Sequence, residues 1–267
     1  MILSRFRTLS TLALFIFALW IPPVGAQPTL VKDINLRAPG SNIDNFVAVG
    51  NLVYFTAETG ANGEELWRSN GTAAGTVLVK DIWLGSGGSS PSELTNVNGV
   101  LYFTAYTAVN GAELWRSDGT AAGTVLVKDI WPGSGSSLSS GESGLTNING
   151  VLYFSADNGV NGEELWRSNG TAAGTVMVKD ILPGSGSSLS EPGFTNINGV
   201  LYFTAYTAIT GGELWRSDGT AAGTILVKDI WPGSVGSGPS FLTNVNGVLY
   251  FWADNGVVGE ELWRLAP

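Results

Sequence analysis

A glutamate, a tryptophan and an arginine recur together along this sequence, in a string that reads ELWR. A carboxylate beside a large aromatic side chain could form a ligand-binding site. The string is written five times, and its tryptophans are Trp67, Trp115, Trp166, Trp215 and Trp263. This repetition allows two interpretations: a binding site that is present several times, or a structural element of a repeating fold.

The composition excludes several kinds of catalytic and metal site. The sequence contains no histidine, which removes the Ser–His and Cys–His nucleophile pairs and the commonest zinc ligand. It contains no cysteine either, which removes disulfides and thiolate metal sites. The stretch DNGVNGE (157–163) alternates oxygen-bearing side chains but lacks the D-x-D-x-D-G order of a calcium loop. We therefore expect no cofactor and no metal site, with calcium as a weaker alternative.

Loops that precede the ELWR strings are the places where the copies differ. Three copies carry an acid there and two carry a tyrosine, at Glu58, Tyr106, Asp157, Tyr206 and Asp254. Variable loops on a rigid scaffold often carry function, so we expect these five residues to bind any ligand the chain recognises. The alternative is that the loop tips have drifted without a function.

The tryptophans of ELWR are better explained by packing than by binding. Burying about 200 Å² at about 25 cal/mol per Å² gives an upper estimate of about 5 kcal/mol for each ring. A second set, Trp83, Trp131 and Trp231, follows the string KDI. We interpret these three as packing between repeats, and exposed platforms for sugars are the alternative.

The elements that position these side chains repeat about every 48 residues. The ELWR tryptophans stand at 67, 115, 166, 215 and 263, so their spacings are 48, 51, 49 and 48. One unit contains four expected strands, at 92–98, 100–106, 113–117 and 124–130, with Asn98-Gly99 as a hairpin turn. Units of this length and content predict an all-β, five-bladed β-propeller over residues 27–267. A parallel β-helix is the main competitor, although its coils are usually about half as long.

Turn length predicts a register between the third and fourth strands. If Ser117 faces Thr124, then Trp115 lies opposite Leu126 and the glutamate lies opposite a lysine. The expected pairs are Glu65–Lys80, Glu113–Lys128, Glu164–Lys179, Glu213–Lys228 and Glu261–Lys32. The last pair would close the ring, with residues 29–34 as the fourth strand beside residues 261–264.

The first 26 residues have the pattern of a secretory signal peptide. Arg5 and Arg7 precede a short apolar run at 12–21, and small residues at 24–26 precede the expected cleavage site. We therefore expect a secreted or cell-surface protein without a membrane span after cleavage. The chain has 22 acidic and 13 basic residues and a net charge of −9, which argues against nucleic acid as a partner.

The string ELWRSDGTAAGT (113–124) resembles the ELWxxDGT repeat, a motif of exported, mostly bacterial proteins. The resemblance covers essentially all of residues 27–267 and implies a β-propeller and export. Asn70 and Asn169 depart from the motif where Asp is expected, and the fifth copy stops at Arg264 without DGT. The resemblance implies no defined activity.

Three functions remain open from the sequence. The first is a non-catalytic scaffold or interaction module that binds a protein or a glycan at the cell exterior, and it implies that the chain is not an enzyme. The second is a lectin-like propeller, because near-identical blades would bind glycans with avidity. The third is a glycosidase, which needs two carboxylates about 5–10 Å apart in one pocket.

Overall fold

The computed structural model describes residues 27–36, 40–139, 143–190 and 193–266. The chain divides into two compact units, Met1–Leu30 and Val31–Pro267, and the first is described only from residue 27. The predicted signal peptide, residues 1–26, lies outside the described residues. Within the described ranges, no helix has the length and apolar character needed to cross a membrane.

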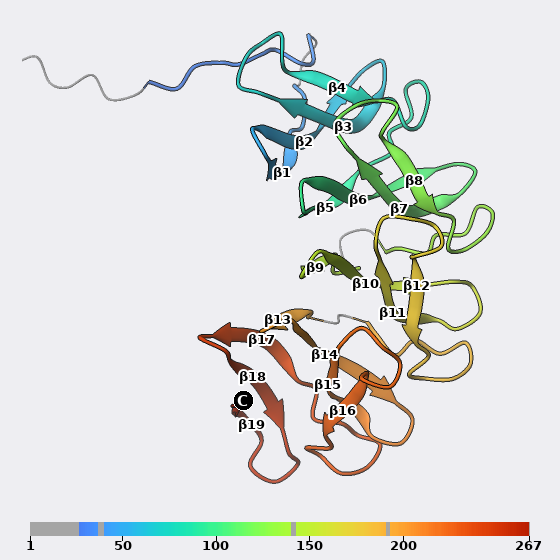
Figure 1. The fold of residues 1–267 in the computed structure, drawn as a ribbon, viewed down its shortest axis with the longest axis vertical. Helices are drawn as coiled ribbons and strands as arrows, with labels where there is room; N and C mark the ends of the chain where they lie inside the picture. The colour runs from blue at the N-terminus through green and yellow to red at the C-terminus, as the bar shows by residue number, and fades with distance from the viewer. Residues whose placement is uncertain (1–26, 37–39, 140–142, 191–192, 267) are drawn as a thin grey trace, which may run out of the picture. The chain divides into compact units, whose positions relative to one another are not determined.

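The unit Val31–Pro267 consists of five antiparallel sheets that follow one another along the chain (Figure 1). The first two sheets are β1 (Asp44–Val49), β2 (Leu52–Thr59), β3 (Gly63–Ser69), β4 (Val77–Lys80), and β5 (Ser92–Val97), β6 (Val100–Thr107), β7 (Gly111–Ser117), β8 (Val125–Lys128). The next two are β9 (Thr146–Ile148), β10 (Val151–Asp157), β11 (Glu163–Ser168), β12 (Val176–Lys179), and β13 (Thr195–Ile197), β14 (Val200–Thr207), β15 (Gly211–Ser217), β16 (Ile225–Lys228). The last has three strands, β17 (Ser240–Val245), β18 (Val248–Asp254) and β19 (Glu260–Leu265). The predicted five-bladed β-propeller is confirmed.

The predicted Asn-Gly hairpin turn joins the first two strands of the second sheet. Asn98 and Gly99 have φ angles of 52° and 87°, as a two-residue type I′ turn requires. Asparagine tolerates this left-handed conformation better than most residues, and glycine adopts it without steric cost. The same dipeptide makes the same turn in the three sheets that follow, at 149–150, 198–199 and 246–247.

The DGT string turns the chain between the third and fourth strands. Asp118 Oδ1 accepts hydrogen bonds from Thr120 N at 2.8 Å and from Thr120 Oγ1 at 2.7 Å. Asn70 makes the same two contacts through its own Oδ1, at 3.1 and 2.8 Å from Thr72. The turn therefore needs a side-chain oxygen rather than a charge, which explains why copies with Asn in place of Asp retain it.

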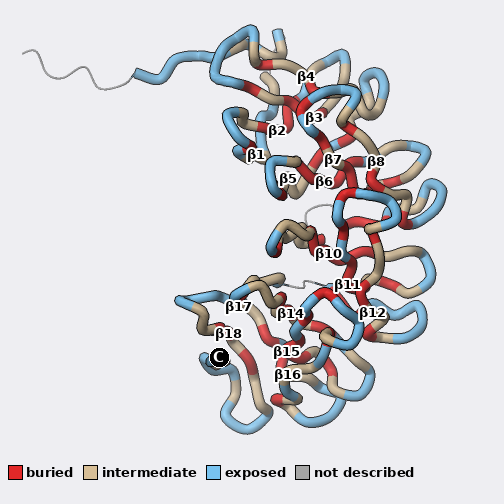
Figure 2. Tube along the Cα trace, in the orientation of Figure 1, coloured by how far each residue is buried: buried red, intermediate tan, exposed pale blue. Residues whose placement is uncertain are grey.

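The hydrophobic cores lie between neighbouring sheets. In the core between the first two sheets, Leu66 of β3 packs with Phe103 of β6 and Trp115 of β7. Three similar cores join the second sheet to the third, the third to the fourth and the fourth to the fifth. Buried residues concentrate in the second and third strands, as Figure 2 shows. Trp115, Trp166 and Trp215 are part of these cores, Trp263 packs against the last one, and Trp67 belongs to a smaller cluster of the first sheet, so the ELWR tryptophans pack as the sequence predicts.

The predicted Glu–Lys pairs between the third and fourth strands are wrong. Trp115 lies opposite Leu126 as expected, but Lys128 lies opposite Leu114 rather than Glu113. The physical reason is a β-bulge, which inserts one extra residue, Val127, into the fourth strand. The same shift occurs in the other sheets that have a fourth strand, so the pairs Glu65–Lys80, Glu164–Lys179 and Glu213–Lys228 are corrected too.

Each lysine instead reaches the following sheet. Lys128 Nζ donates to the carbonyl of Thr175 at 2.8 Å and lies 5.6 Å from the ring centroid of Trp166. The ring face is electron-rich, so it attracts the ammonium group. The lysine therefore links neighbouring blades and does not neutralise a glutamate within its own blade.

Each ELWR glutamate of the first four sheets is fully buried and binds the connector that leaves its own sheet. Glu113 accepts hydrogen bonds from Ile130 N at 3.1 Å, Trp131 N at 3.2 Å and Ser137 Oγ at 2.5 Å. Glu65 makes equivalent contacts with its connector. The glutamate thus satisfies backbone groups that the connector would otherwise bury unpaired.

The predicted ring-closing pair is not among the strand pairs of the described residues. Residues 27–35 form no strand, and β19 pairs only with β18. Closure by residues 29–34 and 261–264 therefore stays a prediction.

Candidate functional site in the central cavity

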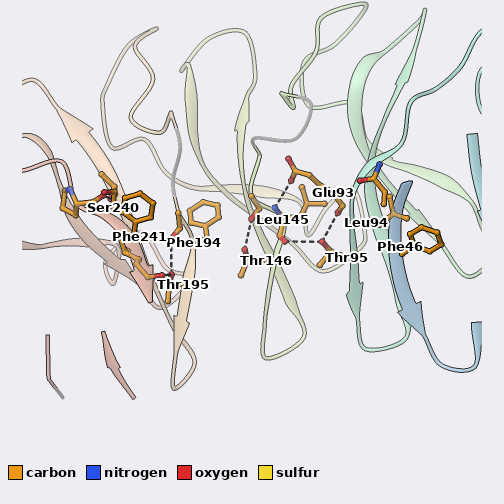
Figure 3. Close-up of a pocket in the computed structure, with 16 residues that line it drawn as sticks. Phe46, Glu93, Leu94, Thr95, Leu145, Thr146, Phe194, Thr195, Ser240 and Phe241 are labelled. Atoms are coloured by element: carbon orange, nitrogen blue, oxygen red, sulfur yellow. Dashed lines mark hydrogen bonds between the residues drawn. The ribbon is translucent and has the colours of Figure 1, made fainter. Parts of the chain in front are cut away.

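A cavity of the unit Val31–Pro267 is lined mainly by residues that lie in, or just before, the first strands of the five sheets (Figure 3). Its volume is about 960 Å³. We call it the central cavity, and its lining residues are Asn45, Phe46, Glu93, Leu94, Thr95, Gly144, Leu145, Thr146, Gly193, Phe194, Thr195, Thr204, Pro239, Ser240, Phe241 and Leu242. A cavity of this size matches the upper end of typical small-molecule sites.

One position in, or two residues before, each first strand has a left-handed backbone and lines the central cavity. The five φ angles are 56° at Asn45, 53° at Glu93, 67° at Gly144, 55° at Gly193 and 55° at Phe241. Such a bulge re-aims a side chain, and register shifts mark it in β1, β5 and β17. Glycine suits this conformation, whereas a larger residue is strained by about 1–3 kcal/mol. Two sheets place a large side chain at this strained position, as Glu93 and Phe241.

Two phenylalanines present open ring faces at the cavity. Phe241 is 83% exposed and Phe46 is 66% exposed. The Phe46 ring stacks on Phe55, with centroids 5.7 Å apart and an interplanar angle of 25°, so that one of its faces is held in place. Phe194 lines the cavity as well, but it is half-buried and packs edge-on against Phe203. Exposed aromatic rings at a cavity favour binding of a ligand with an apolar face.

Polar side chains at the cavity are mostly uncharged. Glu93 is the one carboxylate among the lining residues, and it accepts hydrogen bonds from Ser143 N at 2.7 Å and Leu145 N at 3.0 Å. The lining contains no lysine and no arginine. Ser240 Oγ is buried and has no hydrogen-bond partner among the described residues. The site therefore offers apolar surface, hydroxyl and amide groups and one fixed negative charge.

The five ligand-binding residues predicted from the loops occupy one equivalent position in the five sheets. Each donates its backbone N–H to the carbonyl of a serine in the preceding connector: Glu58 to Ser41, Tyr106 to Ser89, Asp157 to Ser137, Tyr206 to Ser188 and Asp254 to Ser237. None of the five lines the central cavity. Tyr106 lines a separate cavity of about 310 Å³, which contains none of the other four. The structure therefore does not bring the predicted residues together.

The cavity residues Phe46, Glu93 and Phe241 were missed because the sequence interpretation concentrated on loops. A signal was present in the first strands, where the last four copies align on the triplet TN[VI]. Phe241 stands two residues before that triplet, at a position that is glycine in the third and fourth units. Sequence alone does not reveal that this position has a left-handed backbone and lines a cavity.

The buried ELWR glutamates have perturbed pKa values without being at a site. Burial raises the pKa of Glu113 to about 7, and burial also raises the pKa of Glu65 and of Glu164. A raised pKa can mark a general acid. Glu113, however, lines none of the three cavities, and its oxygens are occupied by the connector. These shifts are a consequence of packing.

The connector tryptophans pack between repeats. The ring of Trp83 lies 5.0 Å from that of Tyr106, and a side chain at Gly87 would contact Trp83. Trp131 contacts Gly135 in its own connector and Gly159 in the following blade. This agrees with packing between repeats rather than with platforms for sugars. No group of three acidic, histidine or cysteine residues placed to hold a metal occurs in the described part of the chain.

Comparisons with known proteins support the fold. No family model matches the chain. No curated protein matches it. Among solved structures, a mutant of puromycin hydrolase has a TM-score of 0.53 at 14% identity, and the match covers 91% of this chain and 39% of that one. The chain thus spans about two fifths of the length of that protein.

Two further matches are glycosidases by name. An endo-1,4-beta-xylanase from Bacteroides thetaiotaomicron has a TM-score of 0.34 at 15% identity, covering 84% of this chain and 90% of that one. An endo-arabinanase from Bacillus licheniformis has a TM-score of 0.31 at 15% identity, covering 84% and 93%. The likeness concerns the fold, and the named activities are those of the matched proteins.

These comparisons correct the predicted function. The chain was expected to be a non-catalytic scaffold and therefore not an enzyme. The solved structures that it resembles are enzymes by their names, and several act on carbohydrates. The scaffold interpretation is therefore withdrawn, and with it the expectation that the chain is not an enzyme.

Proposed function

We propose that this chain is an exported protein of the ELWxxDGT repeat type that binds a neutral oligosaccharide in the central cavity. The observation that carries the proposal is the pair of exposed rings, Phe46 and Phe241, in a cavity that has no cationic side chain among its lining residues. The pattern of the first 26 residues supports export.

The rings suit a sugar because one face of a pyranose carries mainly C–H groups. Such a face packs against an aromatic ring, while the hydroxyls at the sugar's edge keep hydrogen-bonding partners. Phe241 is held on a strained backbone with its side chain 83% exposed, and packing within the protein does not explain that placement. Strain at a cavity is a feature of functional positions.

The charge of the lining favours an uncharged ligand. A uronic acid, a sulfated sugar or a phosphate would meet the Glu93 carboxylate without any lysine or arginine from the lining to offset it. The hydroxyl of Ser240 and the amide of Asn45 can serve sugar hydroxyls as donors or acceptors. We therefore expect neutral hexose or pentose chains to bind in preference to acidic ones.

Hydrolysis of a bound sugar in this cavity would have to involve Glu93. The usual mechanism uses two carboxylates about 5–10 Å apart, and Glu93 is the one carboxylate of the lining. The binding experiment should therefore also measure the release of reducing ends from every glycan that binds.

The test is a glycan array followed by calorimetry on residues 27–267, with neutral and acidic oligosaccharides side by side. Phe241→Ala and Phe46→Ala should each weaken binding of the best neutral glycan by about tenfold, or ~1.4 kcal/mol. Tyr206→Ala is the matched control, because Tyr206 is an exposed aromatic residue that does not line the central cavity.

Two outcomes would contradict the proposal. In the first, no neutral glycan binds, or acidic glycans bind more tightly. In the second, Tyr206→Ala abolishes binding while Phe241→Ala and Phe46→Ala leave it unchanged. That result would show that the glycan binds at the variable loops and not in the central cavity. Release of reducing ends that Glu93→Gln abolishes would assign a glycosidase reaction to the same cavity.

A further inference from the structure

A second cavity lies beside the ring of Tyr106 and shares no lining residue with the central cavity. We call it the Tyr106 cavity. Its volume is about 310 Å³, about a third of the 960 Å³ of the central cavity. Apart from Tyr106, it is lined by serine, threonine, alanine and leucine side chains, so none of its lining residues is charged. Its size is at the lower end of small-molecule sites.

The cavity is open because a small residue lies opposite Tyr106. β6 and β7 pair Tyr106 with Ala112, and opposite residues of two strands lie on the same face of the sheet. Three other sheets have an acid and a glutamate at these two positions, as Glu58–Glu64, Asp157–Glu163 and Asp254–Glu260. A glutamate in place of Ala112 would therefore occupy the space beside the ring.

The fourth sheet has a similar pair in a different setting. Tyr206 lies opposite Gly212, but the connector backbone at Gly236 forms a β-bridge with Gly212. In the second sheet the equivalent contact runs through a side chain, because Ala112 N donates to Ser136 Oγ at 3.0 Å. Tyr206 lines neither the central cavity nor the Tyr106 cavity. It therefore provides a matched control for Tyr106.

The ring of Tyr106 is held in place by Trp83 of the preceding connector. The two ring centroids are 5.0 Å apart, with an interplanar angle of 40°. Tyr106 is still 36% exposed, so part of its ring surface remains open. Leu182 stands in the place of Trp83 before Tyr206, so the fourth sheet lacks this support. A fixed ring at the edge of a cavity offers a surface on which the C–H face of a ligand can pack.

Two serines at the cavity have complementary hydrogen-bonding capacity. Ser136 Oγ accepts a hydrogen bond from Ala112 N at 3.0 Å, so its own O–H can donate to a ligand. Ser139 Oγ donates to Glu163 Oε1 at 2.9 Å, so its oxygen can accept from a ligand. A ligand hydroxyl both donates and accepts, and it therefore suits this pair.

Ser90 lines the same cavity on a strained backbone. Its φ of 45° is left-handed, and the equivalent residue of the last connector is Gly238, with a φ of 55°. Glycine adopts this conformation without steric cost, whereas serine is strained there. The Ser90 side chain is exposed, so burial does not compensate for the strain. Strained residues at a cavity are typical of functional positions.

We propose that the Tyr106 cavity is a second binding site, which takes a single neutral sugar ring. The C–H face of the sugar packs on the Tyr106 ring, and its hydroxyls bind Ser136 and Ser139. An acidic sugar is disfavoured, because the Glu163 carboxylate lies directly behind Ser139 and no lining residue is cationic. The site does not depend on which ligand binds in the central cavity.

The first test is an NMR titration of the protein with the methyl glycosides of glucose, galactose and xylose, and with that of glucuronic acid as the acidic comparison. Tyr106→Ala should weaken binding of the best neutral glycoside by about tenfold. Ala112→Glu, which reproduces the arrangement of the first and third sheets, should weaken it at least as much. Tyr206→Ala should bind like the parent. Melting temperatures show whether each variant is folded.

A second measurement locates the sugar without removing the tyrosine. The chain has no cysteine, so Ser90→Cys introduces a single thiol at the cavity. A neutral glycoside at about ten times its Kd should slow alkylation of this thiol by iodoacetamide about tenfold, because only the unoccupied fraction reacts. Ser86→Cys is the control, because Ser86 is an exposed serine of the same connector that lines neither cavity. Its alkylation rate should not change.

The outcomes separate this site from the central cavity. Binding that Tyr106→Ala and Ala112→Glu weaken and Phe241→Ala leaves unchanged supports the proposal. Binding that Phe241→Ala removes and Tyr106→Ala leaves unchanged would assign the sugar to the central cavity, and would overturn the second site while supporting the proposed function. The second site would also be overturned if no neutral glycoside bound, if the glucuronide bound more tightly, or if Ser90→Cys were not protected.

Discussion

Ser137 Oγ donates a hydrogen bond of 2.5 Å to Glu113 Oε2 in the buried interior of the second blade. The equivalent bonds, Ser89 to Glu65, Ser188 to Glu164 and Ser237 to Glu213, are all 2.6 Å long. Each joins a third strand to the connector 24 residues further along the chain. The repeated glutamate therefore holds each connector to its blade, and the ELWR string is a structural element of the repeating fold rather than a binding site that is present several times.

Glu113→Ala should destabilise the propeller strongly. The substitution leaves Ile130 N, Trp131 N and Ser137 Oγ without their acceptor in a buried environment. An unsatisfied buried donor costs about 1–3 kcal/mol, so the free energy of unfolding should fall by about 3 kcal/mol or more. Chemical denaturation measures this free energy. Glu163→Ala is the control, because Glu163 is an acidic residue of β11 that is only partly buried. A loss below about 1 kcal/mol would contradict the fastening role.

The stability that Glu113 contributes should depend on pH with a defined sign. Burial raises the pKa of Glu113 from 4.5 to about 7, so the folded state holds this proton more tightly than the unfolded state does. Its contribution is therefore fully present below pH 4.5 and is lost as the pH rises through about 7. The melting temperature of the parent chain minus that of Glu113→Gln should fall across this window, because glutamine does not titrate. A difference that rises with pH would contradict the assignment.

The fold was predictable because its signals are local and repeated. The spacing of Trp115 and Trp166, the Asn98-Gly99 turn and the short DGT loop each depend on a few neighbouring residues, and all agree on one architecture. The register of Glu113 was not predictable, because it depends on a bulge at Val127 that no turn residue announces. Because of this one inserted residue, Lys128 contacts the next blade and Glu113 binds the connector, instead of pairing with each other.

The DGT turn predicts which substitution is tolerated at Asp118. Asp118→Asn should fold with nearly the same melting temperature at neutral pH, because Asn70 already makes both contacts through Oδ1. Asp118→Ala should melt at a lower temperature, because Thr120 N and Oγ1 lose their acceptor. Thermal melts of the two variants make the comparison. Equal losses for both would show that the charge, rather than the oxygen, holds the turn.

Asp118 should also titrate with the opposite sign to Glu113. Hydrogen bonds from the Thr120 side chain and backbone lower the pKa of Asp118 below its usual value of 3.8. Its contribution to stability is therefore present above pH 3.8 and is lost as the pH falls through the lowered pKa. The melting temperature of the parent chain, nearly equal to that of Asp118→Asn at neutral pH, should fall below that of Asp118→Asn on acidification below pH 3.8. A parent chain that melts there at the same temperature as Asp118→Asn, or at a higher one, would contradict the contact with Thr120.

The candidate site was less predictable than the fold. Tyr106 and Tyr206 drew attention because the loops around them vary, but variation shows only that packing does not constrain a position. Phe46 and Phe241 lie in strands, where aromatic residues are normally taken as core. Their placement at the cavity follows from a bulge within each sheet and from the arrangement of the first strands of different units, and the second of these depends on residues far apart in the sequence.

Phe241 should show a trade-off between stability and binding. Its φ of 55° is left-handed and its side chain is 83% exposed, so it is strained without compensating burial. Phe241→Gly relieves about 1–2 kcal/mol of strain and loses about 0.5–1 kcal/mol of backbone entropy, so the free energy of unfolding should rise by about 0.5 kcal/mol. Phe241→Ala keeps the strain and should be less stable than the glycine variant, while both should bind the neutral glycan more weakly.

Glu93→Gly is the contrast at the equivalent backbone position of the second sheet. It should be destabilising, because Glu93 accepts hydrogen bonds from Ser143 N and Leu145 N. Denaturation curves of the three variants measure these changes in the free energy of unfolding. A Phe241→Gly variant that is less stable than the parent would contradict the prediction, because it would mean that the Phe241 side chain stabilises the fold by packing.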